Sequence, residues 1–228
     1  MTAVEALEII AIQESAVTDD LDHVEIYTLG GLVTLLWHGR GRSERTVVLV
    51  GGAMGGLLGP ADGLFADLGQ ELLAHDISTV RVSYRRPNDL DACVHDVVAI
   101  TELAVRGGTE RVVLGGHSFG GAVAVRSGVA LGDYVAGVVT FATQSAGCEI
   151  ADQLPPTPLR LYHGDRDELL PLAASELVAA LGEGELTVLA DTGHLLAEAG
   201  DRLRGQVEPW IVDRLERGPA GETDGRIV

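Results

Sequence analysis

Short runs of apolar, often β-branched residues recur along the chain and are separated by longer stretches in which apolar residues repeat every three or four positions. The runs predict strands, and the longer stretches predict amphipathic helices. The run at 46–50, Thr-Val-Val-Leu-Val, has no polar alternation, which is typical of a strand buried on both faces of a parallel sheet. The predicted strands are 7–12, 24–29, 32–37, 46–50, 78–84, 111–114, 135–141, 159–163 and 186–190.

Strands that alternate with helices indicate an α/β fold, in which helices cover both faces of a mainly parallel sheet. The predicted helices are 64–73, 89–106, 121–131, 172–181 and 201–217. Pro209 lies inside the last of these, and its missing N–H should kink that helix or divide it. Gly30 and Gly31 should turn the second strand back into the third as a hairpin.

Length and composition suit one globular domain, which we place at 1–217, followed by a Gly- and charge-rich, flexible tail at 218–228. The formal net charge of −18 disfavours nucleic acid and anionic membrane surfaces as partners. Cys93 and Cys148 form no ligand motif, so neither a metal site nor a disulfide scaffold is expected. The acidic first 20 residues and the absence of a long apolar run predict a cytoplasmic protein.

The pattern Gly116-x-Ser118-x-Gly120 lies where the strand at 111–114 turns sharply into a helix. A nucleophilic serine at such a turn needs glycines on either side, because larger side chains would collide with the neighbouring strand or helix. A chain of this composition would contain the pattern by chance roughly 0.14 times. An ordinary glycine-rich turn with an exposed serine is therefore the alternative, and the rest of the chain has to decide.

A serine nucleophile needs a base within hydrogen-bonding reach and an acid that orients the base. His194 follows the last predicted strand on a loop that could reach the serine, so it is the candidate base. Asp167 in the loop after the strand at 159–163 is the candidate acid, and it is preferred to Asp165, which starts a turn. We expect His23, His38, His75 and His95 to be surface or satisfied core residues, His117 to point away from the nucleophile, and His163 to be structural, packing near the acid loop.

Two backbone N–H groups should bind the oxyanion of a tetrahedral intermediate. Phe119, directly after the candidate nucleophile at a helix N-terminus, would supply one of them. The glycine-rich loop 51–56 would supply the other from Ala53 or Met54, which the sequence does not separate. This loop matches neither of the common phosphate-binding glycine motifs, so a nucleotide site is not expected.

Ser118, Asp167 in Gly164-Asp165-Arg166-Asp167-x-x-x-Pro171, and His194 resemble the nucleophile elbow, acid and histidine of the α/β-hydrolase superfamily, in that family's chain order. The closest resemblance is to small bacterial dienelactone hydrolases and carboxylesterases. It implies a mainly parallel, eight-stranded sheet with an antiparallel start. Many members insert a helical lid where this chain has only the short segment 144–158, so a lidless, open site is implied.

The expected function is therefore a cofactor-independent serine hydrolase that cleaves carboxylic esters or lactones through an acyl-enzyme, with a small-molecule substrate. The sequence leaves an acyltransferase, a thioesterase or a cyclase open, and also a binding protein that keeps the fold without turnover. Oligomeric state is not indicated. Residues that could line the substrate site, or simply pack, are Gly52, Met54, Leu57, Leu58, Phe119, Gln144, Leu169 and Leu195.

Overall fold

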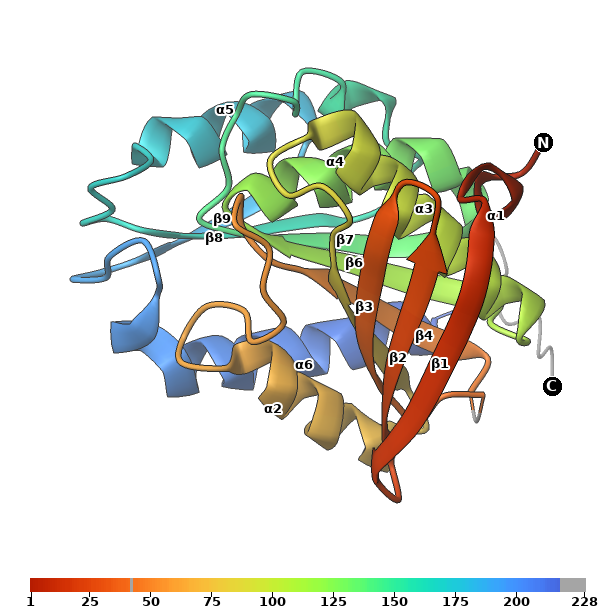
Figure 1. Ribbon diagram of the computed structural model, residues 1–228. Helices are drawn as coiled ribbons and strands as arrows, with labels where there is room; N and C mark the ends of the chain where they lie inside the picture. The colour runs from red at the N-terminus through yellow and green to blue at the C-terminus, as the bar shows by residue number, and fades with distance from the viewer. Residues whose placement is uncertain (42, 218–228) are drawn as a thin grey trace, which may run out of the picture.

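A single nine-stranded sheet forms the centre of the computed structural model, which describes residues 1–41 and 43–217 (Figure 1). The predicted tail at 218–228 lies outside the described residues. The strands are β1 Ile9–Thr18, β2 Leu21–Thr28, β3 Gly31–His38, β4 Arg45–Val50, β5 Ser78–Ser83, β6 Arg111–His117, β7 Val135–Phe141, β8 Leu159–Gly164 and β9 Glu185–Leu189. They lie in the order β1-β2-β3-β5-β4-β6-β7-β8-β9.

The sheet has an antiparallel part and a parallel part. The pairs β1–β2, β2–β3 and β3–β5 are antiparallel. The remaining pairs, in the sheet order β5-β4-β6-β7-β8-β9, are all parallel. The hairpin predicted at Gly30 and Gly31 joins β2 to β3. Since parallel strands end at one edge, the loops after β4, β6, β8 and β9 are brought together there.

The expectation of eight strands is corrected to nine, because β1 adds an outer strand to the antiparallel part. The predicted strand 7–12 begins two residues too early and ends six residues too early. All residues of β1 except Ile9 are exposed, so no burial pattern marks most of its length. Backbone pairing with β2, which continues as far as Thr18, therefore decides where this strand ends.

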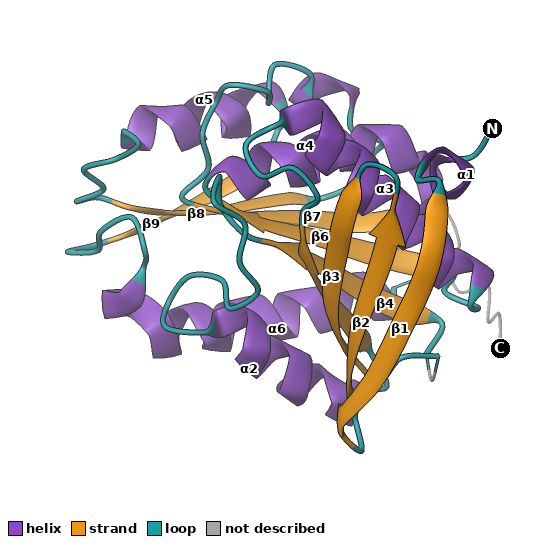
Figure 2. Cartoon of the chain, viewed as in Figure 1, coloured by secondary structure: helices purple, strands orange, loops and turns teal. Residues whose placement is uncertain are grey.

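Helices form one layer on each face of the sheet (Figure 2). The helices are α1 Ala3–Ala6, α2 Leu64–Glu71, α3 Leu90–Arg106, α4 Phe119–Leu131, α5 Leu172–Leu181 and α6 Gly200–Glu216, with short 3₁₀ segments η1 Leu72–His75, η2 Gly132–Tyr134, η3 Ala151–Gln153 and η4 Ala197–Ala199. Helices α1, α3, α4 and α5 lie on one face, and α2 and α6 lie on the other. We predicted that Pro209 would kink the last helix or divide it. Helix α6 continues through Pro209, so the predicted division is wrong.

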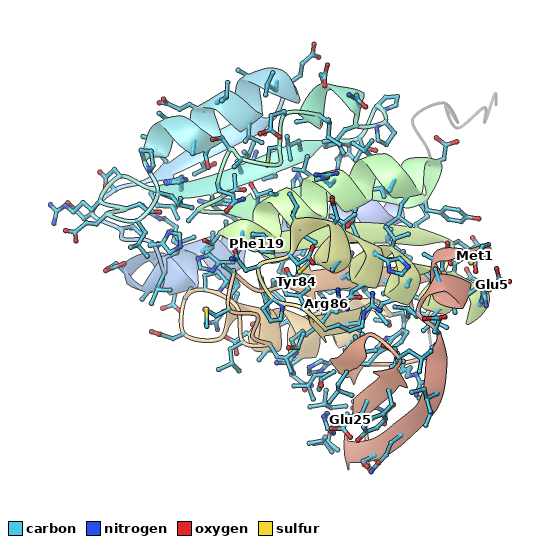
Figure 3. All side chains as sticks on the ribbon, turned by 45° about the horizontal axis from the view of Figure 1, so that its top comes forward. Met1, Glu5, Glu25, Tyr84, Arg86 and Phe119 are labelled. Carbon is cyan, nitrogen blue, oxygen red and sulfur yellow. The ribbon has the colours of Figure 1, made fainter. Side chains whose placement is uncertain are left out.

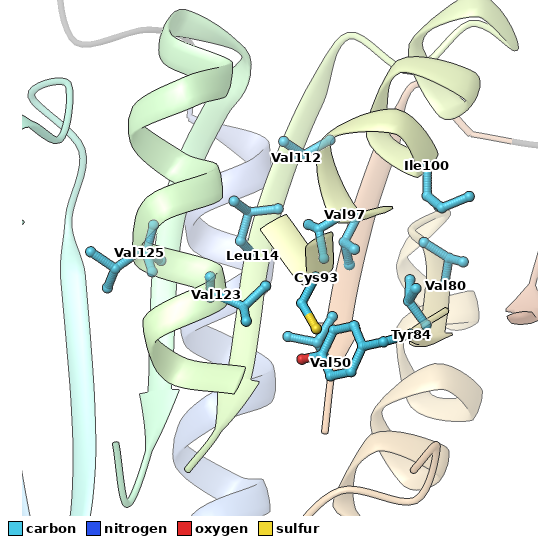
Figure 4. Close-up of a cluster of buried hydrophobic side chains, with 14 of the residues drawn as sticks. Val50, Val80, Tyr84, Cys93, Val97, Ile100, Val112, Leu114, Val123 and Val125 are labelled. Atoms are coloured by element: carbon cyan, nitrogen blue, oxygen red, sulfur yellow. The ribbon is translucent and has the colours of Figure 1, made fainter. Parts of the chain in front are cut away.

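Two apolar layers hold the helices to the sheet, and β4 contributes to both. Its Val48 and Val50 pack toward α3 and α4, whereas Val47 and Leu49 pack toward α2 and α6. Figure 4 shows part of the first layer, where Val50 lies among side chains of β5, α3, β6 and α4. The unbroken apolar run predicted for this strand therefore results from burial on both faces.

The connection from β7 to β8 contains no lid domain. Between Phe141 and Leu159 the only helical segment is η3, which has three residues. No helix in residues 1–41 and 43–217 is both long enough and apolar enough to span a bilayer.

Candidate active site

The predicted chemical groups all follow carboxyl ends of parallel strands. The loop that begins at Gly51 follows β4, Ser118 follows β6, Asp167 lies beyond β8, and His194 lies beyond β9. The parallel registers place these four ends at one edge of the sheet. The fold thus gathers residues that are more than 140 positions apart in the sequence.

Ser118 occupies a strained turn between β6 and α4. Its φ of 57° and ψ of −120° lie in a region that non-glycine residues rarely adopt. The Ser118 N–H donates to the Phe141 carbonyl at 2.8 Å, and the Ser118 carbonyl accepts from the Gly121 N–H at 3.0 Å. A Cβ on Gly116 would overlap the Gly120 carbonyl, so the turn tolerates no side chain there.

The loop after β4 passes directly over Ser118. A Cβ placed on Gly52 would lie 3.6 Å from the Ser118 Cβ, and the Gly55 N–H donates to the Gly52 carbonyl at 2.9 Å, which closes a tight turn. Of the two candidate oxyanion donors within that turn, Ala53 is half-buried against the core and Met54 is 91% exposed.

Tyr84, just beyond β5, braces this side of the site. Its buried hydroxyl donates to the Gly51 carbonyl at 2.9 Å, and its ring meets the Phe119 ring edge-on with centroids 6.2 Å apart (Figure 3). Burial is the largest of the effects that raise the pKa of Tyr84 well above its usual value, so the hydroxyl remains a donor. The aromatic pair therefore links the glycine loop to the helix that carries Phe119.

Asp167 and His194 are brought into direct contact. The His194 Nδ1 lies 2.7 Å from the Asp167 Oδ2, and the Asp167 Oδ1 accepts the N–H groups of Leu169 and Leu170, both at 2.9 Å. Burial opposes the charge of Asp167, but the Leu170 N–H, the His194 ring and the Leu169 N–H together hold its pKa below the ordinary value. An ionised carboxylate can only accept, so Nδ1 of His194 carries the proton and Nε2 is left to act as a base.

Ser118 is not hydrogen-bonded to His194 among the described residues. The His117 ring touches the His194 ring, and its Nδ1 lies 3.8 Å from the place that a Cβ on Gly52 would take, so His117 lies near both the glycine loop and His194. Hydrogen bonds of this kind are often long in unliganded enzymes and tighten only when substrate binds.

Two further histidines, His163 and His117, contact this pair, and the sequence indicated only the first of these contacts. As expected, His163 packs against the acid loop, where its Nε2 lies 3.1 Å from the Leu170 carbonyl and 3.3 Å from the Asp167 Oδ2. The ring of His117 lies against that of His194, with centroids 4.9 Å apart. In the sequence, the only indication of a role for His117 is that it directly precedes the candidate nucleophile at the end of a strand. That position does not indicate which residue its ring contacts.

The other predicted Asp, Asp165, is exposed and accepts the Thr192 N–H at 3.3 Å. It therefore links the loops after β8 and β9, and within the described residues its carboxylate contacts no histidine. The geometry sets Asp165 and Asp167 apart, which residue type and spacing could only suggest.

The predicted lining residues differ in how far they are exposed. Leu169 and Leu195 flank the Asp167–His194 pair and are 73% and 64% exposed. Gln144 is half-buried, and its amide donates to the Ala146 carbonyl at 2.7 Å within its own loop. Leu57 is also half-buried, whereas Leu58 is 64% exposed.

A cavity of about 260 Å³ lies elsewhere, under the antiparallel strands near the end of α3. Its lining includes Val24, Leu35, Trp37 and Leu103, and it contains none of the predicted site residues. No group of three or more His, Cys, Asp or Glu side chains is arranged to bind a metal in the part of the chain that the structure describes.

Comparison with known proteins agrees with this architecture. A family model described as Phospholipase/Carboxylesterase matches residues 94–199, which include β6, the turn at Ser118 and the loops of Asp167 and His194. No curated protein matches the sequence.

Solved structures resemble the whole domain at low sequence identity. Est1E from Butyrivibrio proteoclasticus has a TM-score of 0.72 at 13% identity, over 86% of this chain and 99% of that chain. A lidless α/β serine hydrolase from Xanthomonas campestris has a TM-score of 0.71 at 20% identity, over 90% of this chain and 100% of that chain. A dienelactone hydrolase from Anabaena variabilis has a TM-score of 0.72 at 15% identity, over 90% and 99%.

The fold and the candidate site thus define a lidless α/β protein built like the serine hydrolases. The chain has the fold of the α/β hydrolases, and its residues 94–199 match the phospholipase and carboxylesterase family model.

Proposed function

We propose that this protein is a serine hydrolase that cleaves carboxylic esters through an acyl-enzyme on Ser118. The observation that carries the proposal is the 2.7 Å contact between His194 Nδ1 and Asp167 Oδ2 at the sheet edge where the strained Ser118 turn lies. The match to the phospholipase and carboxylesterase family supports it. So does Est1E, which has been solved with ferulic acid bound, since a carboxylic acid is the acyl product of ester cleavage.

In the first half of the reaction, the Ser118 Oγ attacks the ester carbonyl carbon and its proton passes to Nε2 of His194. Asp167 accepts a hydrogen bond from the Nδ1–H of His194 and stabilises the imidazolium that forms. The carbonyl oxygen becomes an oxyanion, which the N–H groups of Phe119 and Ala53 would bind. We favour Ala53 over Met54 because it is half-buried in the turn over Ser118.

The tetrahedral intermediate then collapses, and the bond from carbon to the alcohol oxygen breaks. The alcohol leaves with the proton from His194, and the acyl group remains on Ser118 as an ester. His194 next takes a proton from water, whose oxygen attacks the acyl carbon. A second tetrahedral intermediate releases the carboxylic acid and returns the proton to Ser118, so every atom is balanced and no cofactor is required.

The open edge of the sheet favours water as the acceptor. The segment between β7 and β8 carries no lid domain that could exclude solvent, and His194 remains partly accessible, with 10% of its side chain exposed. The exposed Leu169 and Leu195 offer apolar contacts for the acyl or alcohol part of a neutral ester.

Hydrolysis of p-nitrophenyl acetate, butyrate and octanoate by the wild type and Ser118→Ala tests the proposal, with fluorophosphonate labelling in parallel. We expect turnover and labelling in the wild type and a loss of about 10⁵-fold or more in kcat in Ser118→Ala. Ser145→Ala, in the segment between β7 and β8, is the matched control and should stay active. Labelling without turnover would indicate an acyl transfer to another acceptor, and unlabelled protein would refute the nucleophile.

A further inference from the structure

His163 and His117 share one arrangement on opposite sides of the Asp167–His194 pair. Both rings are buried, with exposed fractions of 0% and 7%, and both lie at carboxyl ends of parallel strands, β8 and β6. Each directs Nε2 at a backbone carbonyl in the loop that carries one member of the pair. The catalytic steps above use neither residue.

On the acid side, all polar atoms of the His163 ring have partners. Nε2 lies 3.1 Å from the Leu170 carbonyl, and Nδ1 lies 2.7 Å from the Ser175 hydroxyl on α5. A carbonyl only accepts, so Nε2 donates to it and the Ser175 hydroxyl donates to Nδ1. The ring thereby ties the end of the acid loop to β8 and α5, and its Nε2 also lies 3.3 Å from the Asp167 Oδ2.

On the base side, the His117 Nε2 lies 3.0 Å from the carbonyl of His194 itself. By the same reasoning Nε2 donates, so one histidine holds the backbone of the other. The two rings are tilted by 47° with centroids 4.9 Å apart, which also restricts rotation of the His194 side chain. The loop after β9 is therefore held to the strand that precedes the nucleophile.

Resting on the proposed function, we infer that His163 and His117 are positioning residues that hold Asp167 and His194 in register through their Nε2–H donors. An error of about 1 Å in such a pair can reduce catalysis on the order of 100-fold. Two loops with no helix or strand of their own need this kind of external support. The neutral rings supply it without adding a charge that would compete for the Asp167 carboxylate.

Burial is the main cause of the lowered pKa of both rings, and it brings that of His117 to about 4. The charged or titratable groups that act on His163 are Asp167, His194 and Glu176, and those that act on His117 are His194 and Asp167. Both rings consequently remain neutral donors near pH 7, where the hydrolysis would operate.

Substitutions by glutamine and by asparagine test whether the Nε2–H donor or only the bulk of the ring is needed. A glutamine amide can place an N–H close to the histidine Nε2, whereas an asparagine amide reaches only to Nδ1. We expect His163→Gln and His117→Gln to keep kcat within about threefold of the wild type. His163→Asn and His117→Asn should lower kcat by about 10- to 100-fold with little change in KM.

His95→Asn is the matched control. The His95 Nε2 also meets a backbone carbonyl, that of Ala3 at 2.9 Å, but on the helical layer away from the sheet edge. This variant should lose stability without a change in kcat. Thermal unfolding of every variant verifies that the fold is retained, so a fall in kcat with an unchanged unfolding temperature reports positioning.

The acid limb of the kcat/KM profile gives a second readout. It should move to higher pH in His163→Asn, since a carboxylate without the second N–H nearby holds the His194 proton more tightly, and it should not move in His163→Gln. Equal kcat and pH profiles in the Asn and Gln variants would overturn the inference.

A measurement without turnover separates this inference from the proposed function. The downfield proton resonance of the His194–Asp167 bond can be assigned by its loss in Asp167→Asn. It should persist in the Gln variants and broaden or vanish in the Asn variants. If the wild type hydrolyses no ester but the resonance behaves in this way, the positioning role stands and the proposed function fails; if the resonance is unchanged throughout, the positioning role fails.

Discussion

Different chemical groups support the two sides of the candidate site. We call the surroundings of Ser118 the nucleophile side and the surroundings of Asp167 and His194 the acid–base side. Around Ser118 the supporting contacts are mostly main-chain: the Phe141 carbonyl, the Gly121 N–H and glycines where no Cβ fits. Around Asp167 and His194 side chains take part as well: the rings of His163 and His117 and the Ser175 hydroxyl add to the main-chain N–H groups that bind the Asp167 carboxylate.

The difference determines what each side tolerates. A backbone turn in close contact with its neighbours has no room for an added atom, whereas a side-chain donor can be replaced by another donor at the same place. The nucleophile side is thus sensitive to volume, and the acid–base side is sensitive to hydrogen-bonding groups. The following experiments test this contrast, starting with the largest expected effect.

Replacing Asp167 by Asn should cause the largest loss on the acid–base side. The amide keeps the shape but no longer favours the Nδ1-protonated form of His194, and loss of this role lowers kcat by about 10⁴-fold in related chemistry. The check is steady-state kinetics on p-nitrophenyl butyrate, with Asp165→Asn as the matched control. The Asp165 carboxylate accepts the Thr192 N–H and meets no histidine among residues 1–41 and 43–217, so the control should remain active; the opposite result would make Asp165 the acid.

Replacing Gly116 by Ala should damage the nucleophile side through volume alone. The new Cβ would overlap the Gly120 carbonyl, and relief of such overpacking costs about 3 kcal/mol of unfolding free energy. Gly205→Ala, within α6 and with no heavy atom within 4 Å of the added Cβ, should instead gain roughly 0.5–1 kcal/mol. Urea unfolding measures both, and equal stability of the two variants would contradict the contrast.

The third expected effect, of at most the size expected for Gly116→Ala, is a loss of stability in acid caused by the buried rings. The pKa of His117 is lowered to about 4 in the folded protein, so the unfolded chain takes up its proton first as the pH falls. Unfolding free energy should therefore decrease between pH 6.5 and about pH 4, by up to about 3 kcal/mol for this residue.

Urea unfolding of the wild type and of His117→Gln, near pH 7 and near pH 4, measures how much of the loss of unfolding free energy is due to His117. The variant should lose less stability over this interval, although part of the dependence remains because the pKa of His38 is also lowered to about 4, mainly by burial. An identical pH dependence in both proteins would show that folding does not lower the pKa of His117.

Much of the parallel sheet could be predicted from local patterns. The run at 46–50 lies in β4, and the turn into Ser118 lies between β6 and α4. These features depend on residues within a few positions of one another, since burial on two faces requires an unbroken apolar run and a tight turn requires glycine. The exposed strand β1 lacks such a pattern, and its full extent follows from pairing with β2.

The sequence by itself determined the α/β class, the candidate chemical groups and the chain order Ser118, Asp167, His194, because residue type and local periodicity carry that information. Only the tertiary structure decided that Asp167 rather than Asp165 meets His194, and that His163 and His117 direct Nε2 at the Leu170 and His194 carbonyls. The physical reason is distance along the chain. A hydrogen bond depends on positions within a few tenths of an ångström, and the loops that make these bonds are brought together only by the packed sheet.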